Sequence, residues 1–233
     1  MENNLLLYHG STKIIDSPEF GKGNPHNDYG PGFYCTENPE LAKEWACISR
    51  NGGFANAYAM EMKNCSVLEL TTPEYGILDW LAVLVNNRVF NISSRLASEA
   101  KEYLTEHFLP DISMYDVIKG YRADDSYFTF AMDFLSNSIS LRQLSRAMLL
   151  GELGEQLMVK SRKAFSKLMF VGSEPVDGEV YFAKRSVRDK NAREQYLKRD
   201  RNTDRRADDI FMINILNEEI KRHDSRLQEN ILI

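Results

Sequence analysis

The sequence has few of the residues that build a metal centre or a disulfide framework, and it has no long apolar run. Cys35, Cys47 and Cys65 are its only cysteines, and they show no CxxC spacing and no nearby histidines. We therefore expect no metal, and we expect the cysteines to fill the core in a reducing compartment. No stretch approaches the roughly 20 apolar residues of a membrane helix. The first residues also lack the pattern of a signal peptide, so a soluble, cytoplasmic protein without a membrane partner is expected.

The two most common phosphate-binding loops are missing as well. No GxGxxG opens a helix and no GxxxxGK[ST] occurs, so neither a Rossmann nor a P-loop nucleotide site is expected. The composition is that of a globular protein, with 43% hydrophobic and 27% charged residues. Short strand patterns occur towards both ends of the chain and a helical block lies between them. This order favours an α+β fold over a doubly wound one.

Apolar alternation and short apolar runs predict the strands, and apolar positions at helical spacing predict the helices. Strands are expected at residues 4–10, 32–36, 57–62, 66–70, 116–120, 155–161 and 167–176. Asn38 and Pro39 are typical of a helix start, and this helix should run to Arg50. Two helices packed on a sheet are expected within 77–108, two more within 128–150, and a short basic turn or helical segment from Arg162 to Phe165. Polar helices should follow residue 180, with one apolar stripe at their end that contains Ile210, Ile213, Ile215, Leu216 and Ile220.

Two motifs carry a resemblance to a known superfamily. YHGST at residues 8–12 and GPGFYCTENPELAKEWA at residues 30–46 resemble the His-Tyr-Glu branch of the ADP-ribosyltransferases, which includes diphtheria toxin and the poly(ADP-ribose) polymerases. The chain is even more similar, over most of residues 5–175, to a bacterial family of unknown function with a YHGS start and a GKGFYLT-like segment. The resemblance implies a split β-sandwich with a NAD cleft over residues 1–180, with a helical insertion at about 77–150 and a helical extension at 181–233.

The resemblance also implies roles for individual residues. His9 would donate to the adenosine-side ribose, the Gly10 backbone would meet the nicotinamide carboxamide, and Ser11 would lie near the ribose. Tyr34 would stack on the nicotinamide ring, and Trp45, eleven residues further on, would close the other face of the ring. Stacking and cation–π attraction suit a flat cationic ring. The segment that presents Tyr34 would also contribute Gly32 and Phe33.

The superfamily places a glutamate on a late strand to hold the ribose 2'-hydroxyl, and two residues compete for this position. The polymerase pattern selects Glu155, whereas the closer bacterial family has a glutamine that aligns with Gln156. Only one of the two can face the cleft, because neighbouring strand residues point to opposite faces. We favour Gln156, which can hydrogen-bond the 2'-hydroxyl but carries no charge, so slower chemistry is expected. The alternative that both lie on the surface of an edge strand stays open.

The activity implied by the resemblance is ADP-ribosyl transfer from NAD to a macromolecular acceptor, with release of nicotinamide. The acceptor, protein or nucleic acid, cannot be read from the sequence. The resemblance to the bacterial family suggests the toxin of a toxin–antitoxin or phage-defence system. An antitoxin or another protein is therefore a further expected partner. NAD hydrolysis is one alternative function. A catalytically inactive module that binds NAD or ADP-ribose is another.

Other polar clusters carry weaker signals. The basic segment from Lys184 to Arg206 could contact phosphates or an acidic protein, but interleaved acidic residues favour a solvated helix. Asp124 and Asp125 could bind metal or act as a base, but loop carboxylates are more often solvated. The isolated histidines His26, His107 and His223 are expected in surface or loop roles.

Overall fold

The computed structural model describes residues 4–92, 94–123, 125–148, 150, 154–198 and 205–229. By contact the chain forms two compact units. The sheet unit comprises the residues up to Glu69 together with Asp111–Arg122 and Gly154–Arg188, and the helical unit comprises the remainder. All the described strands belong to the sheet unit, so the fold is α+β, as predicted. The helical insertion at about 77–150 and the domain boundary at residue 180, which the resemblance implies, stay a prediction.

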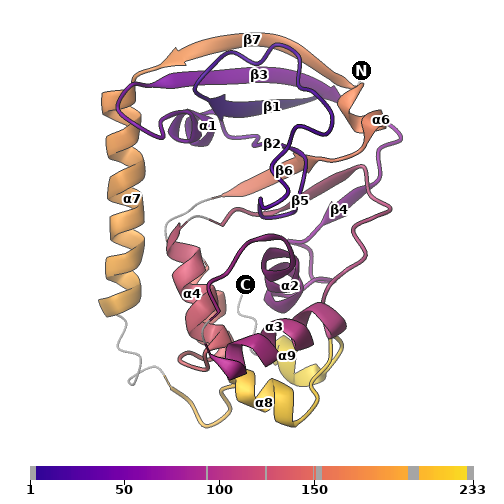
Figure 1. Cartoon of the computed structure of the whole chain (residues 1–233), viewed down its shortest axis with the longest axis vertical. Coiled ribbons are helices and arrows are strands. Elements are labelled where there is room, and N and C mark those ends of the chain that lie inside the picture. Colours follow the sequence, from indigo (N-terminus) through magenta and orange to yellow (C-terminus); the bar gives the residue numbers. More distant parts are fainter. Residues whose placement is uncertain are drawn as a thin grey trace. The chain divides into compact units, whose positions relative to one another are not determined.

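One sheet of the sheet unit contains three antiparallel strands in the order β1–β3–β7 (Figure 1). β1 spans Asn4–Ser11, β3 spans Gly53–Glu61 and β7 spans Leu168–Val176. The sequence predicts a strand at each place, but β3 begins at residue 53 and not at 57. The extra residues form a strand because Gly53 pairs with Val176, a partner that only the folded chain supplies.

The second sheet has four strands in the order β2–β6–β5–β4, and β4 and β5 are its parallel pair. The strands are β2 (Phe33–Cys35), β6 (Glu155–Val159), β5 (Val117–Tyr121) and β4 (Val67–Glu69). The two sheets share one apolar core, to which both contribute fully buried side chains. Its members from the first sheet are Leu7 and Met60, and those from the second are Cys35, Val117, Leu157 and Val159.

Helix α1 (Pro39–Ala46) packs on β1 and β3. The predicted cap is confirmed, because the Asn38 side chain accepts hydrogen bonds from the backbone N–H groups of the first turn. The predicted end at Arg50 is wrong. The helix ends at Ala46 because Cys47 leaves the helical conformation, and its buried side chain packs in a cluster with Ala55 and Val176.

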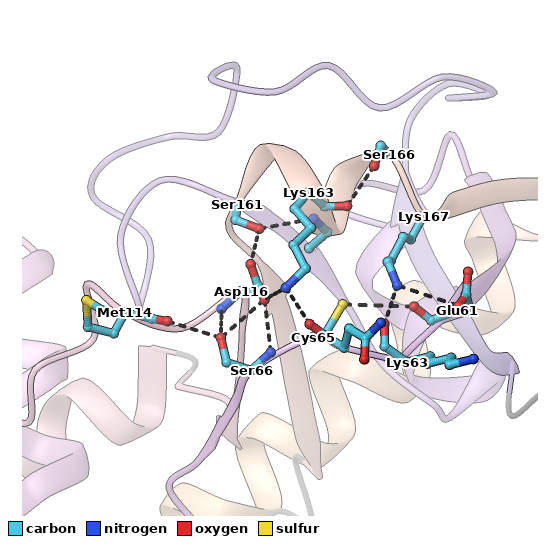
Figure 2. Close-up of polar contacts among 12 residues, drawn as sticks. Glu61, Lys63, Cys65, Ser66, Met114, Asp116, Ser161, Lys163, Ser166 and Lys167 are labelled. Atoms are coloured by element: carbon cyan, nitrogen blue, oxygen red, sulfur yellow. Dashed lines mark hydrogen bonds and ion pairs between the residues drawn. The ribbon is translucent and has the colours of Figure 1, made fainter.

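Asp116 holds together the ends of three elements of the sheet unit (Figure 2). Its carboxylate accepts hydrogen bonds from the Ser66 backbone N–H (2.9 Å), the Ser161 hydroxyl (2.6 Å) and the Lys163 ammonium (2.8 Å). Lys163 belongs to α6 (Arg162–Phe165), the short basic segment predicted to be turn or helix. The Lys163 ammonium, followed by the Ser161 hydroxyl, holds the pKa of Asp116 well below its usual range. No sequence pattern singled out this network.

Four helices of the helical unit lie where the sequence predicts them. They are α2 (Ile77–Asn87), α3 (Arg95–His107), α4 (Asp125–Leu135) and α5 (Leu141–Ala147). Within their unit, α2 and α3 pack on each other, and α3 also packs on α4. That the first two pack on a sheet stays a prediction. Among the described residues, no helix has the length and apolarity needed to cross a membrane.

The last helices are α7 (Gly178–Lys198), α8 (Met212–Asn217) and α9 (Ser225–Glu229). The predicted single stripe is wrong in one respect. Ile215 and Ile220 are buried, but Ile213 is 36% exposed, because it lies on α8 two residues before Ile215 and residues at this spacing point to nearly opposite sides of a helix.

Two ion pairs hold residues 209–222 on the earlier helices of the helical unit. Arg142 contacts Asp209 at 2.6 Å with both side chains buried, and Arg222 contacts Asp79 at 2.5 Å. The Tyr103 hydroxyl also donates to the carbonyl oxygen of Ile220. The buried apolar residues of this segment, Ile210, Met212, Ile215, Ile220 and Leu227, belong to the same unit as these partners.

Candidate functional site

His9, on β1, contacts the backbone of Tyr34. Nδ1–H of His9 donates to the Tyr34 carbonyl oxygen at 2.6 Å, and the imidazole packs on Phe33 with 4.4 Å between the ring centroids. Burial lowers the pKa of His9, while the hydrogen bond to Tyr34 acts in the opposite direction. The imidazole is therefore neutral near neutral pH. Because a carbonyl only accepts, the proton is on Nδ1, and Nε2 is left as a hydrogen-bond acceptor.

The hydroxyl of Tyr34 is fixed by two backbone groups of the preceding turn. Its hydroxyl donates to the Gly30 carbonyl oxygen at 2.7 Å and accepts from the Tyr29 backbone N–H at 2.9 Å. The rings of Tyr29 and Tyr34 are stacked at 22°, with 6.4 Å between centroids. Gly30 has φ +85°, a conformation that favours glycine, and so permits the turn that brings these groups together.

His9 and Tyr34 line the same cavity, which has a volume of about 660 Å³. Gly32, Phe33 and Phe165 of α6 also line it. The irregular loop of residues 13–27 lines the cavity as well and contributes two basic and two acidic side chains. Those four are Lys13, Lys22, Asp16 and Glu19.

Aromatic rings continue from this wall towards the surface. The ring centroid of Phe165 lies 6.4 Å from that of Phe33 and 5.5 Å from that of Phe20. Phe20 is 42% exposed. The guanidinium of Arg162 lies over the Phe20 ring at 4.3 Å. A row of rings that begins at His9 and ends beside a cation suits a flat heterocyclic ligand.

Gly10 and Ser11 do not line the cavity. A Cβ at Gly10 would lie 1.9 Å from the Ala42 carbonyl oxygen, so glycine is required here for close packing of β1 on α1. The Ser11 hydroxyl accepts from Asn56 Nδ2 at 2.9 Å, and the same amide nitrogen donates to the His9 carbonyl oxygen at 3.2 Å. Asn56 also accepts from the Ile15 backbone N–H at 3.1 Å, so it fixes the end of β1 and the start of the loop.

Sequence reasoning missed Asn56, although a signal was present. The residue is fully buried on β3, where an amide interrupts a run of apolar and small side chains. A buried amide must find hydrogen-bond partners, so its position predicts a bonding role.

Trp45 lies on α1 outside the cavity lining. The guanidinium of Arg122, directly after β5, lies 4.7 Å from the centre of its ring. A cation therefore already occupies one face of the indole.

Glu155 and Gln156 point to opposite faces of β6. Gln156 is 4% exposed and donates from Nε2 to Asp28 Oδ2 at 2.7 Å and to the Tyr121 carbonyl oxygen at 3.3 Å. Glu155 instead forms an ion pair with Lys119 at 2.9 Å, and its side chain is 39% exposed. Tyr34 pairs with Met158 across β2 and β6, so strand alternation places Gln156 and Tyr34 on one face of the sheet.

The remaining candidates do not join the cavity. Asp124 and the side chain of Asp125 lie outside the described residues. His26, His107 and His223 do not line it, and no group of metal-binding side chains occurs in the part of the chain that the structure describes.

The basic segment carries many paired charges. Arg188 contacts Glu44 at 2.7 Å, Lys184 contacts Glu40 at 3.2 Å, and Glu194 lies within 4 Å of two lysines one turn away on either side. Arg199 and Arg201 lie outside the described residues. This pattern is that of a helix with interleaved charges.

The structure thus unites four of the predicted site residues, His9, Gly32, Phe33 and Tyr34, around one cavity. Gln156 lies on the same sheet face as Tyr34 but does not line the cavity, and neither do Gly10, Ser11, Trp45 and Glu155.

Comparison with known proteins identifies one family. No curated protein and no solved structure matches the chain. A family model described as "Protein of unknown function (DUF3990)" matches residues 5–170, which include both sheets up to the first part of β7 and the whole cavity wall. The chain belongs to this family of unknown function.

Proposed function

We propose that the protein is an NAD-dependent ADP-ribosyltransferase that transfers ADP-ribose to a macromolecular acceptor and releases nicotinamide. The observation that carries this proposal is the hydrogen bond from His9 to the Tyr34 carbonyl oxygen at the wall of one cavity. The sequence motifs assign these two residues to different parts of one dinucleotide, and both line the same space. Its volume of about 660 Å³ falls within the range of small-molecule sites.

The finer fold assignment belongs to the same proposal. A split β-sandwich of the ADP-ribosyltransferase type is supported by two small sheets that share one core, with β1 and β2 joined through a bridge between Tyr8 and Thr36. The motif residues lie on these two strands, at the point where the sheets meet.

The chemistry of the cavity wall suits the adenosine half of NAD. In the proposed complex, Nε2 of His9 accepts a hydrogen bond from a ribose hydroxyl and does not donate one as the resemblance implies, because the proton of the neutral imidazole lies on Nδ1 and is bound to the Tyr34 carbonyl oxygen. Phe165, which lines the cavity, offers an aromatic ring to the adenine. Lys13 and Lys22 provide positive charge for the pyrophosphate.

The transfer step itself places positive charge on the nicotinamide ribose. The bond from ribose C1' to the nicotinamide nitrogen breaks and its electron pair leaves with nicotinamide, while an acceptor atom bonds to C1' and gives up its proton. An enzyme accelerates this step by stabilising the cationic sugar. In this chain the Gln156 amide is the group proposed to hold the 2'-hydroxyl, which orients the sugar without adding negative charge.

A module that binds NAD or ADP-ribose without turnover is the second candidate, and one observation favours it. The position that needs a carboxylate carries Gln156, and the neighbouring carboxylate of Glu155 is turned away to Lys119. Water as the acceptor would give a third outcome, NAD hydrolysis. A toxin role with an antitoxin or other partner protein is the biological context in which we place transfer to a macromolecule.

Incubation of the protein with labelled NAD and cell lysate tests the proposal. Transferase activity gives labelled macromolecules and free nicotinamide, hydrolysis gives free ADP-ribose and nicotinamide without a labelled macromolecule, and a binding module gives calorimetric binding of NAD without products. The His9→Ala variant should lose NAD binding, and His223→Ala, an exposed histidine of the helical unit, should retain it. Absence of NAD binding to the intact protein rejects all three outcomes.

A further inference from the structure

Tyr34, the residue proposed to stack on nicotinamide, already carries a ring of its own chain. Tyr29 is 1% exposed, stacks on Tyr34 at 22°, and donates its backbone N–H to the Tyr34 hydroxyl at 2.9 Å. The Tyr29 hydroxyl in turn donates to the carbonyl oxygen of Tyr121. The ring of Tyr29 therefore already lies next to Tyr34, the ring on which nicotinamide would stack.

Gln156, the residue proposed to hold the ribose 2'-hydroxyl, is occupied in a similar way. Its Nε2 donates to Asp28 Oδ2 at 2.7 Å, and both side chains are buried, with 4% and 5% exposed. A hydroxyl oxygen of a ligand and a carboxylate oxygen are both acceptors for this amide. Asp28 precedes Tyr29 directly, so one short segment of the loop supplies both contacts.

Trp45, proposed to close the second face of the nicotinamide ring, has a cation beside it. The Arg122 guanidinium is planar and positively charged, and it lies 4.7 Å from the indole centre. Nicotinamide bound in NAD is likewise a flat cation. All three residues, Asp28, Tyr29 and Arg122, belong to the sheet unit, as do their partners.

We propose that Asp28, Tyr29 and Arg122 determine access to the nicotinamide half of the site. Each of them contacts a residue that would otherwise bind the nicotinamide ring or its ribose. This inference rests on the proposed function. The cavity beside His9 then admits an adenine nucleotide directly, whereas the complete dinucleotide binds only when Asp28, Tyr29 and Arg122 move aside. The residues thereby set how strongly the protein prefers NAD over a nucleotide that lacks nicotinamide.

The energetic consequence follows from population shift. A ligand that binds only the open arrangement loses affinity in proportion to the fraction of molecules that are open. A ligand that touches only the adenosine half is not affected by this fraction. Removing one of the closing contacts should therefore raise affinity for the dinucleotide and leave affinity for the nucleotide unchanged.

Calorimetric titrations with ADP and with a non-hydrolysable NAD analogue test the inference in the full-length protein. The variants are Asp28→Ala and Arg122→Gln, with Tyr29→Phe as a conservative third that removes only the hydroxyl bond to Tyr121. We expect the ratio of analogue affinity to ADP affinity to rise about tenfold or more in the first two and less in the third. Asp111→Ala removes an exposed carboxylate of the same unit and should leave the ratio at the wild-type value.

Thermal unfolding shows which variants are folded. If Asp28→Ala does not fold, Tyr29→Phe and Arg122→Gln still test the inference. An unchanged or lower ratio in the folded variants, with ADP still bound, overturns the inference and leaves the proposed function intact. Failure of ADP and the analogue to bind any of these proteins, wild type included, rejects the proposed function and the inference with it.

Discussion

Nδ1 of His9 and the carbonyl oxygen of Tyr34, separated by 25 residues in the chain, lie 2.6 Å apart. The bond joins the first strand of one sheet to the first strand of the other, and it fixes the tautomer of the histidine. It also places both residues at the wall of one cavity.

The stability of the protein should depend on pH through His9. Burial lowers the pKa of His9 in the folded state, while the unfolded chain keeps a value of about 6.5. As the pH falls below this value the unfolded state takes up a proton that the folded state resists, so stability decreases with falling pH. Chemical denaturation at about pH 7.5 and pH 5.5 should show a loss that is smaller in His9→Gln, by about 1 kcal/mol. An equal loss in the wild type and in His9→Gln would contradict the assignment.

Gln156→Glu should destabilise the protein at neutral pH and less so in acid. The new carboxylate would take the place of an amide that lies 2.7 Å from Asp28 Oδ2, and two buried carboxylates at this distance cannot both ionise. One of them has a raised pKa, so the protein regains stability as the pH falls and that group is protonated. We expect a loss of about 1–3 kcal/mol at pH 7.5.

The double variant Gln156→Glu with Asp28→Asn serves as the matched control. It restores one donor and one acceptor to the pair, so most of the lost stability should return. If the double variant is no more stable than Gln156→Glu alone, the contact between residues 28 and 156 is not the cause. In the proposed enzyme, the double variant should also release nicotinamide faster than the wild type, because it adds the missing charge.

Gly10→Ala should severely destabilise the sheet unit. Its Cβ would lie 1.9 Å from the Ala42 carbonyl oxygen and 2.5 Å from the Ala46 backbone nitrogen, and neither backbone can move without separating β1 from α1. We expect a loss of more than about 2 kcal/mol in the free energy of unfolding. Gly172→Ala, on β7, meets no atom within 4 Å and should change stability by less than about 0.5 kcal/mol. Similar unfolding midpoints for the two variants would refute the packing argument.

Asp116→Asn should weaken the junction shown in Figure 2. The substitution removes the charge that Lys163 and the Ser161 hydroxyl stabilise, and it introduces an amide hydrogen where acceptors are needed. Because the pKa of Asp116 is lowered in the folded state, this stabilisation exists above the unfolded value of about 3.9 and is lost as the pH falls. We expect a cost of about 1–3 kcal/mol at pH 7 by denaturant titration. Asp111→Asn, exposed on the same segment, should cost little.

Strand and helix positions followed from the sequence where local pattern and packing agree. β1, β5 and α1 with its Asn38 cap are such cases. The predictions were wrong where a distant partner decides, as at the end of α1, and at Ile213, where the predicted stripe did not follow helical spacing. The Asp116 network could not be foreseen as a site, because its partners lie 45 or more residues away, whereas the amide of Asn56 was a signal that sequence reasoning missed.

The sequence alone determined the α+β class, the placement of the motifs on strands, and the alternation that separates Glu155 from Gln156. These follow from periodicity and backbone geometry, which act over a few residues. Only the tertiary structure decided that the Gln156 amide meets Asp28, that Tyr34 meets Tyr29 and that Trp45 meets Arg122. Contacts between residues far apart depend on how strands pair and on what each buried polar group can bond, and no local pattern records that choice.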